Sequence, residues 1–491
     1  MNNNDLRLIL NTNVSLLVVE TWDESRTLEL LQDLFRTESV PAWSWSCTSG
    51  LAPLGFGLEL ANPEQYADPE VALNFIKQYG KRGAFVLCDM HPYLDAPKII
   101  RQLKDIALSH GQHKHKVVLV SHRLELPAEL SRYGASVSIS MPTEDEILAI
   151  VREQARQWSD KNHRSKIKTD NETLQKLVNN LKGLPHQDVR RLAYGAIADD
   201  GAITEDDLPE VTKAKFALMN MEGILHFEYS TAHLRDVAGL YSLKQWLEDR
   251  RKAMTTDDTA LDPPKGVLLF GVQGGGKSLA AKSIAGVWGL PLLRLDMAAL
   301  FNKYIGETER NLREALKLAD LMSPCVLWLD EIEKGMAQGN DDGGTPKRLL
   351  GTLLTWMAER KSRVFMVATS NDISQLPPEL MRKGRFDEIF FVDLPDNQTR
   401  YTIFSIHLKK RDLDPSRYNL DALAQMSEGY TGAEIEQAVV SATYAAAARN
   451  EKVSNQLLQD AIQKTQPLSV VMAEKMSELK AWAKERAVPA N

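Results

Sequence analysis

Residues 271–278 read Gly-Val-Gln-Gly-Gly-Gly-Lys-Ser, which fits the pattern of a phosphate-binding loop. An apolar run at 266–270 precedes the loop and a helical pattern follows it, so the loop joins a strand to the start of a helix. Glycines let backbone N–H groups turn inward around phosphates, and the helix adds the positive end of its dipole. The residues expected to hold a nucleotide are Gly271, Gly274, Gly275, Gly276, Lys277, Ser278 and Leu279.

Four side chains are suited to a nucleotide that carries magnesium. In the loop, Lys277 can neutralise phosphate charge and the Ser278 hydroxyl can ligate Mg²⁺. About fifty residues later, the apolar run 325–329 ends in Asp330 and Glu331. We expect Asp330 to reach the metal through water and Glu331 to polarise an attacking water. Alone, an Asp-Glu pair after an apolar run is more often a solvated strand end, but its place after a phosphate loop favours the catalytic interpretation.

Length and charge limit the classes of protein that fit. The chain has 491 residues, too many for one hydrophobic core, so two to four domains are expected. The net charge of −7 gives no global basic field, which weighs against nucleic acid as a partner. Cys47, Cys88 and Cys325 lie far apart without metal-ligand spacing, which indicates reduced, buried thiols. No signal-peptide start and no run of ~18 apolar residues is present, so a cytoplasmic or soluble organellar protein without a membrane partner is expected.

The second half alternates short apolar runs with helical patterns, which is typical of an α/β fold with a parallel sheet flanked by helices. From Asn397 onward the pattern is helical and suggests a small lid domain. The expected large α/β domain covers 231–395 and the lid 396–491, with only Val488–Asn491 expected to be frayed. The expected strands are 266–270, 291–296, 325–329, 364–368 and 390–393, and the expected helices are 277–287, 309–321 and 347–359.

The first half repeats the second in degraded form. Residues 84–89, 126–134 and 183–189 match 325–330, 376–384 and 429–435 in the same order, at offsets between 241 and 250. Drifting offsets fit a duplication with changed loop lengths. After its first strand this half has Thr21-Trp-Asp-Glu-Ser-Arg26, an acidic turn without a phosphate loop. We therefore expect a degenerate α/β domain at 1–145, a lid-like helical part at 146–205 and a linker at 206–230.

The order of motifs resembles the AAA clade of P-loop ATPases. The two motifs above match Walker A and Walker B, and Ala368–Asn371 and Leu380–Asp387 follow them in the order of that clade. The whole chain resembles the family of hypothetical chloroplast reading frame forty-six, in which a degenerate first half precedes an AAA module. This resemblance implies that Asn371 orients the attacking water. It also implies that Arg382 and Arg385 are arginine fingers that reach a neighbouring subunit's nucleotide, so a homo-hexameric ring is expected.

The resemblance assigns three further segments. Asp236 and Ala238 would border the adenine, and His407 would lie near the base, although a lone helical histidine is more often simply packed. Lys303, Tyr304 and Ile305 would form a pore loop that grips an unfolded polypeptide; the alternative is a buried tyrosine that caps a helix. Gly432-Ala433 stands where other clades place a sensor arginine, as is also the case in the AAA clade proper.

Three functions remain in competition. The first is a ring motor that hydrolyses ATP with Mg²⁺ and remodels a protein or complex through a central pore. The second is a slow-turnover, nucleotide-dependent switch or scaffold that acts through its degenerate half. The third, a nucleic-acid translocase, is disfavoured by the acidic balance and the lack of a nucleic-acid module. A fused protease is not expected, because no His-Glu-x-x-His segment is present.

Overall fold

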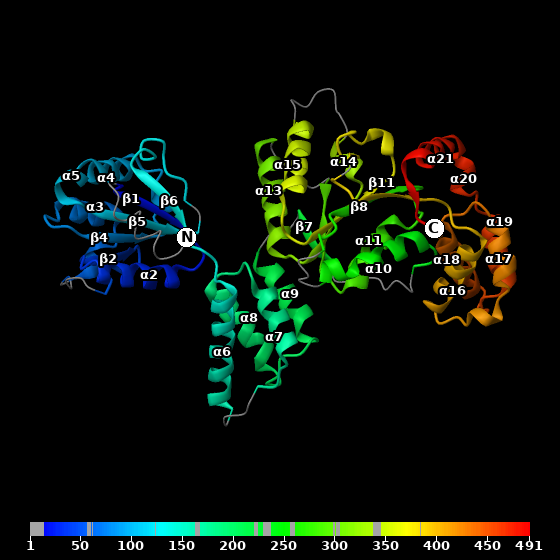
Figure 1. The fold of residues 1–491 in the computed structure, drawn as a ribbon, viewed down its shortest axis with the longest axis horizontal. Coiled ribbons are helices and arrows are strands. Elements are labelled where there is room, and N and C mark those ends of the chain that lie inside the picture. The colour runs from blue at the N-terminus through cyan, green and yellow to red at the C-terminus, as the bar shows by residue number, and fades with distance from the viewer. Residues whose placement is uncertain are drawn as a thin grey trace. The chain divides into compact units, whose positions relative to one another are not determined.

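The computed structural model describes residues 14–55, 60, 62–122, 124–162, 167–219, 224–228, 237–255, 261–297, 300, 305–336, 345–382 and 384–491. The chain divides into two compact units, residues 1–211 and 212–491, each built around its own sheet (Figure 1). Among the described residues, no helix combines the length and the apolar composition that a bilayer crossing needs.

The first unit contains a six-stranded sheet in the order β3-β2-β4-β5-β1-β6. Only β3 is antiparallel to its neighbour; the other pairs are parallel. The strands are β1 (Leu16–Glu20), β2 (Ala42–Ser46), β3 (Gly50–Pro53), β4 (Ala84–Cys88), β5 (Lys116–Ser121) and β6 (Gly134–Ser138). The remaining elements at this sheet are α2 (Glu24–Thr37), η1 (Pro63–Tyr66), α3 (Pro69–Gln78), η2 (His91–Tyr93), α4 (Pro97–Leu108) and α5 (His110–His113).

Helices cover both faces of this sheet because alternate residues of each strand point to opposite sides. In β1, Leu16 and Val18 pack toward α3 and α4, whereas Leu17 and Val19 pack toward α2. Both faces are therefore apolar, as a central parallel strand requires. Four helices complete the unit: α6 (Glu144–Lys161), α7 (Asn171–Leu181), α8 (His186–Ala198) and α9 (Asp207–Leu218), of which α9 runs across the division into the second unit.

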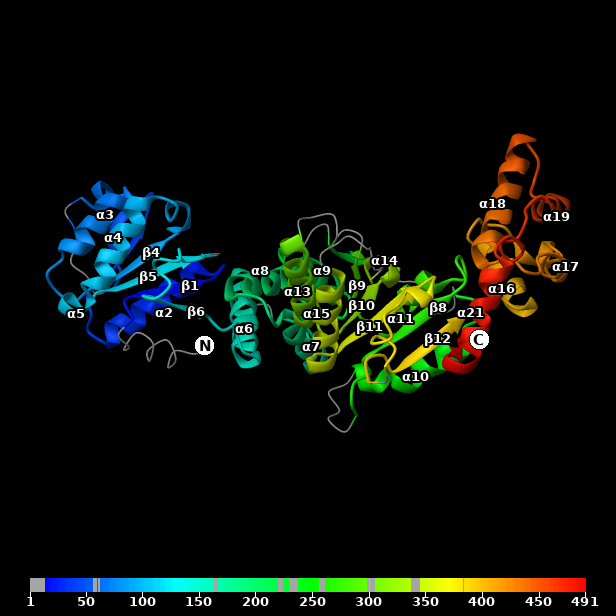
Figure 2. The same ribbon diagram turned by 90° about the horizontal axis from the view of Figure 1, so that it is seen from above.

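The second unit contains a seven-stranded sheet in the order β13-β12-β8-β11-β10-β9-β7, and Figure 2 shows β9, β10, β11, β8 and β12 following one another across it. Its strands are β7 (Leu225–Glu228), β8 (Gly266–Gly271), β9 (Leu292–Leu295), β10 (Cys325–Leu329), β11 (Val364–Ser370), β12 (Glu388–Val392) and β13 (Val488–Pro489). Its helices near the sheet are α10 (Tyr241–Thr255), α11 (Lys277–Trp288), α13 (Ile305–Leu321), α14 (Ile332–Met336), α15 (Thr345–Glu359) and η4 (Ile373–Gln375). On β8, Leu268 and Phe270 pack with α13 and α15, and Val267 and Leu269 pack with α10 and α11.

Five parallel strands have the same order in the two sheets: β2-β4-β5-β1-β6 corresponds to β9-β10-β11-β8-β12. The antiparallel edge strands occupy the same place but are connected differently, because β3 follows β2 in the chain whereas β7 precedes β8. The second sheet then adds β13, which pairs in parallel with β12. The edge strand β7 and helix α9 both lie in the segment 206–230 that was expected to be a linker, so the described part of that segment is regular structure.

The C-terminal helices separate into two groups. A small core joins α16 (Asn397–Lys409), α17 (Leu420–Met426), α18 (Gly432–Ala448) and α19 (Asn455–Gln463), with η5 (Pro415–Arg417) between the first two. After α20 (Leu468–Val471), helix α21 (Ala473–Arg486) returns to the sheet, where the Trp482 ring lies 5.0 Å from that of Phe270. The segment expected as one lid therefore also supplies part of the core of the large domain.

Residues 488–491, expected to be frayed, are ordered against the sheet domain. Ala490 is buried, and its backbone N–H donates to Phe391 O at 2.9 Å. The side-chain oxygen of Asn491 accepts a hydrogen bond from the backbone N–H of Leu240, and its carbonyl accepts from Ser242 Oγ at 3.0 Å. Sequence could not reveal these contacts, because the partners of Asn491 lie about 250 residues away and that of Ala490 about 100 residues away.

Asn491→Ala should weaken nucleotide binding, because Leu240, whose N–H it would leave without this acceptor, borders the cavity described below. One lost hydrogen bond corresponds to about 1 kcal/mol, and we expect a two- to tenfold loss in affinity. Calorimetric titration with a non-hydrolysable ATP analogue measures this. Asn74→Ala, an exposed change in the first unit, is the control; equal affinities in all three proteins would contradict the prediction.

Candidate functional site

The glycine loop has a backbone that only glycines adopt easily. Gly274 and Gly276 have φ of 74° and 99°, in the left-handed region that L side chains avoid. Gly271 has φ of 147°, and a Cβ there would lie 2.1 Å from Val392 O. Strand β12 can therefore approach the start of the loop only because residue 271 has no side chain. The loop leads directly into α11, which begins at Lys277.

The Lys277 side chain is folded back into this loop. It is 6% exposed, and its Nζ donates to Gly271 O at 3.0 Å and Val272 O at 2.8 Å. Burial lowers the pKa of Lys277 to about 8, against the opposing charges of Glu333, Asp330 and Glu331. The ammonium group is thus held by neutral carbonyls and lies within the field of three carboxylates, as a phosphate-binding lysine requires.

Two neighbouring strands position the acidic pair. Asp330 and Glu331 directly follow β10, and Thr369 near the end of β11 contacts both of them. The Thr369 hydroxyl donates to Asp330 Oδ1 at 2.7 Å and accepts from the Glu331 N–H at 3.1 Å. One hydroxyl therefore fixes the direction of both residues at the carboxyl edge of the sheet.

Glu331 is held at both carboxylate oxygens. Asn371 Nδ2 donates to Glu331 Oε1 at 2.9 Å, and the Lys334 ammonium forms an ion pair with Oε2. Glu331 also has φ of 48°, a left-handed conformation that is costly for a residue with a side chain. The structure thus brings the expected catalytic glutamate and the expected sensor asparagine into direct contact.

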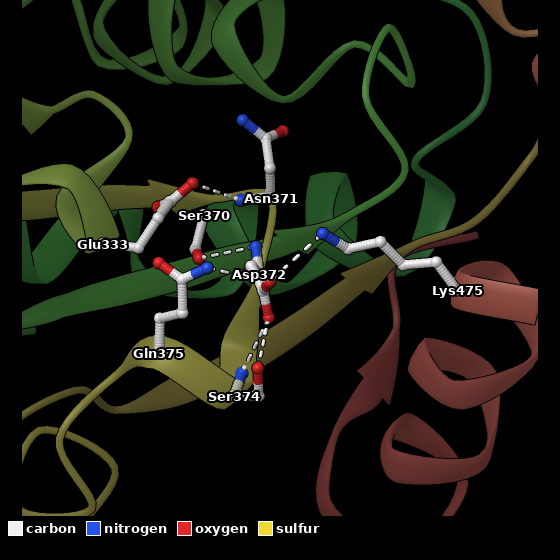
Figure 3. Close-up of polar contacts among 7 residues, drawn as sticks. All are labelled: Glu333, Ser370, Asn371, Asp372, Ser374, Gln375 and Lys475. Carbon is white, nitrogen blue, oxygen red and sulfur yellow. Dashed lines mark hydrogen bonds and ion pairs between the residues drawn. The ribbon is translucent and has the colours of Figure 1, made fainter. Parts of the chain in front are cut away.

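The backbone of Asn371 is anchored to a buried acid. Glu333 is 5% exposed, and its Oε1 accepts from the Asn371 N–H at 2.9 Å (Figure 3). The next residue, Asp372, accepts from Ser374 Oγ at 2.6 Å and from the Lys475 ammonium of α21 at 3.1 Å. Burial acts to raise the pKa of Asp372, but hydrogen bonds from Ser374 and Lys475 outweigh it and leave that pKa below its ordinary value. Helix α21 is therefore tied to the loop that carries Asn371.

Most of the expected site residues line one cavity of about 430 Å³ in the second unit. The lining residues are Val237, Ala238, Leu240, Gln273, Gly274, Gly275, Gly276, Lys277, Ser278, Leu279, Asp330, Glu331, Thr369, Asn371, Ile403, Ile406, His407, Lys410, Gly432, Ala433 and Glu436. One end is the glycine loop with its acidic edge; the other is formed by apolar residues before α10 and on α16. This combination suits a ligand with a polyanionic and an aromatic end.

His407 belongs to the apolar end of the cavity. It lies on α16, and its Nδ1 is 3.4 Å from Glu436 Oε1 of α18, without the alignment of a hydrogen bond. Burial lowers the pKa of His407, although Glu436 opposes the shift, so a neutral ring is favoured at neutral pH. A neutral imidazole beside Ile403 and Ile406 is compatible with an adenine base.

The small residues at 432–433 allow the lid to touch the loop. The Ala433 N–H donates to Gly274 O at 3.3 Å, and a Cβ on Gly274 would lie 3.0 Å from Thr431 Oγ1. Thr431 also caps α18 through a reciprocal capping box with Glu434. The first turn of the lid helix is thus in hydrogen-bond contact with the nucleotide loop.

Seven expected site residues are not among those that line the cavity: Gly271, at the start of the loop, and the six that follow. Arg382 and Arg385 are described but do not line it; Arg385 Nη1 donates to Glu379 O. Asp236, Lys303 and Tyr304 lie outside the described residues. Ile305 begins α13, and its side chain is likewise outside the description.

Sequence reasoning missed several residues that the site depends on. Thr369 lies only two residues before Asn371, so its contact with Asp330 could have been inferred from strand adjacency. Glu333 follows the acidic pair, but its burial depends on tertiary packing. Lys410 and Glu436 lie on two lid helices whose meeting point no local pattern reveals.

The residues present suit ATP and magnesium. Ser278 offers a hydroxyl and Asp330 a carboxylate, and both line the cavity. Hard oxygen ligands of this kind suit Mg²⁺ rather than a transition metal. The glycine loop, the start of α11 and Lys277 together form an anion-binding end for the phosphates.

Comparisons with known proteins agree with this geometry. Residues 267–394 match the family model "ATPase family associated with various cellular activities (AAA)", and 417–460 match the AAA+ lid domain. Residues 2–139 and 145–222 match the N-terminal and second domains of SpoVK-like AAA ATPases. The "Uncharacterized AAA domain-containing protein ycf46" of the red alga Pyropia yezoensis is 34% identical over 490 residues, 98% of this chain and 97% of that protein.

The chain belongs to the ycf46 family of AAA proteins. The ycf46 protein of Guillardia theta is also 34% identical, over 98% of this chain and 94% of that protein. A "Proteasome-activating nucleotidase" from Aeropyrum pernix is 31% identical over 291 residues, 56% of this chain and 69% of that protein. The expected family and fold class are confirmed: an AAA module with a lid, preceded by a SpoVK-like α/β domain.

ATP affinity of this ycf46 family member should fall as pH rises above about 8. The Lys277 pKa of about 8 is raised when phosphates bind beside it, so the bound state holds the proton that the free state loses. Below that pH, Lys277 is charged in both states and the affinity should level off. Calorimetric titrations in two buffers of different ionisation heat should show proton uptake near pH 8.5, about half a unit above this pKa.

Lys277→Arg is the matched control for this pH dependence. Arginine stays charged throughout the range, so this variant should bind without proton uptake whatever its affinity. If the ATP affinity of the wild type is constant from about pH 7 to 9, on both sides of the Lys277 pKa, the assignment of this lysine to the phosphates is contradicted.

Proposed function

We propose that this protein hydrolyses ATP with Mg²⁺. The observation that carries the proposal is the contact of Glu331 with Asn371 at 2.9 Å, at the edge of a cavity lined by Lys277, Ser278 and Asp330. Lys277 and the glycine loop would bind the β- and γ-phosphates, and Ser278 and Asp330 would hold the metal. When bound, Mg²⁺ neutralises charge that develops on the phosphates.

In this proposal Glu331 polarises the attacking water and Asn371 orients it. The Lys334 ion pair has to loosen for Glu331 to do so. The Lys334 side chain is 61% exposed and that of Glu331 is 36% exposed. Ion pairs in such exposed positions contribute about 1 kcal/mol or less. That cost is small beside a hydrolysis barrier, so the ion pair does not argue against catalysis.

The slow-turnover switch remains the second candidate, and the same contacts favour it. While Asn371 and Lys334 both hold Glu331, its carboxylate cannot activate water. If a partner controlled these contacts, the protein would retain nucleotide until that partner arrived. The measured turnover of the isolated protein separates the two candidates.

The proposal of a ring is based on two arginines that do not line the cavity. Arg382 and Arg385 follow β11 by more than ten residues and do not line their own subunit's cavity. We propose that they complete the site of a neighbouring copy, and that the copies form a hexamer. Arginine fingers stabilise transition-state charge without being needed for nucleotide binding.

The substrate proposed for the ring is a protein. Proteasome-activating nucleotidases share 31–37% identity with this chain over its AAA half. Lys303, Tyr304 and Ile305, of which only Ile305 lies within the described residues, are proposed as the pore loop that grips the polypeptide. The proposed location is the cytoplasm or the soluble interior of an organelle, and no nucleic acid is proposed as a partner.

Steady-state ATP hydrolysis across a protein concentration series tests the enzyme proposal. The specific activity should rise with concentration as sites are completed between copies. Glu331→Gln should bind ATP but lose about 100-fold or more in turnover, because the general base is removed. Bound nucleotide with turnover that neither depends on concentration nor responds to this variant would favour the switch.

Mixing two inactive variants tests the arginine proposal. Arg385→Ala should bind ATP nearly normally and lose about 10³-fold in turnover. Lys277→Ala should not bind ATP, but it retains its arginines. Mixed together, the two should regain part of the activity, because some sites combine an intact loop with an intact finger. Arg417→Ala, an exposed lid change, is the control that should hydrolyse normally; a mixture as inactive as its components would refute trans action.

A further inference from the structure

Three potential metal ligands gather at the carboxyl edge of the first sheet. Asp89 directly follows β4, His91 begins η2, and His122 directly follows β5. One ligand atom of each lies within 4.8 Å of those of the other two. Asp89 Oδ1 is 3.8 Å from His91 Nδ1, and the rings of His91 and His122 have centroids 4.9 Å apart.

This edge corresponds to the one that forms the nucleotide cavity in the second unit. By strand order, β1, β4 and β5 correspond to β8, β10 and β11. Parallel sheets bind ligands at the carboxyl ends of such adjacent strands. In the second unit the loop after β8 is suited to an anion; after β1, Asp23 and Glu24 stand in its place.

The charges at this edge favour a cation. Asp23 and Glu24 follow β1 and Asp89 follows β4, so the segments after these two strands carry three acidic side chains. Their charges would attract a positive ion to this edge. A phosphate would instead meet the same negative charge.

We propose that the first unit binds a divalent transition-metal ion, such as Zn²⁺, through Asp89, His91 and His122. Two imidazoles and one carboxylate are a common ligand set for Zn²⁺, whereas Mg²⁺ prefers oxygen ligands alone. Three protein ligands leave the remaining coordination position to water. The site would be separate from the nucleotide cavity, which lies in the other unit.

For the three side chains to bind one Zn²⁺ ion, their ligand atoms must move closer together. In a tetrahedral Zn²⁺ site with bonds of about 2.0–2.2 Å, two ligand atoms lie roughly 3.4 Å apart. The ligand atoms here lie within 4.8 Å of one another, so the widest pair must approach by up to about 1.4 Å. Asp89 and His122 are exposed, and rotation of their side chains can supply this movement.

Neighbouring groups orient two of the three ligands. Ser121 Oγ lies 2.8 Å from His91 Nδ1 and donates to Asp89 Oδ1 at 3.4 Å. Hydrogen bonds of this kind orient the ligands of protein-bound metals. The Trp22 ring lies 4.8 Å from that of His122 although Trp22 is 75% exposed. This exposed indole thus packs on one of the proposed ligands.

Zinc binding by the full-length protein tests the proposal, measured in competition with a chromogenic chelator. Saturating Mg²⁺ and an ATP analogue are present, so that the nucleotide cavity of the second unit is occupied. The wild type should bind one Zn²⁺ equivalent that His122→Ala and Asp89→Asn lose, or bind at least tenfold more weakly. His113→Ala, a histidine of α5 outside the cluster, should bind like the wild type. Equal stoichiometry and affinity in all four proteins would overturn the proposal.

Fluorescence gives a second, local measurement. Co²⁺ bound beside His122 should quench Trp22, so the quenching seen in the wild type should be largely lost in Trp22→Phe, which keeps all three ligands. Circular dichroism verifies that each variant is folded. Quenching of the same size in Trp22→Phe, or its absence in the wild type, would place any bound ion elsewhere and refute the site.

Discussion

The site in the second unit depends on keeping one ammonium group buried. Removing a cation from water is costly unless acceptors and opposite charges surround it. Carbonyls of the glycine loop hold Lys277 directly, and three carboxylates at the ends of neighbouring strands supply the opposing charge. Those carboxylates reach Lys277 only because β11 and β10 follow β8 in the sheet. Burial of the Lys277 ammonium group therefore requires the strand order, the loop conformation and the surrounding charges together.

Local patterns predicted the centre of the second sheet well. The strand run 325–329 agrees with β10 residue for residue, and the helix expected at 277–287 differs from α11 by one residue. Strong apolar runs and a glycine loop determine their own conformation, so neighbours in sequence suffice. For Asn371, the family resemblance implied a role in orienting the attacking water, and that role stays a prediction; its contact with Glu331 is a finding of the structure.

Elements that depend on distant partners were not predicted. Strands β7 and β13 are short and lack a strong apolar run, and they exist because β9 and β12 offer unpaired edges. The return of α21 to the sheet depends on the fit of Trp482 against Phe270. Glu333 and Thr369 matter through tertiary contacts that their neighbours in sequence do not encode.

Both units keep a hydrogen bond from a lid helix to the segment after the first strand, but the acceptors differ. In the second unit Ala433 N–H reaches Gly274 O, part of the loop expected to hold the phosphates. In the first unit Gln187 N–H reaches the Asp23 carboxylate at 3.4 Å, a side chain that also caps α2. The lid contact in the second unit is therefore made to the expected phosphate-binding loop itself, so a ligand held by that loop would act on the lid directly. The lid contact in the first unit is made to a helix-capping side chain, so the described structure gives it no such link to a nucleotide.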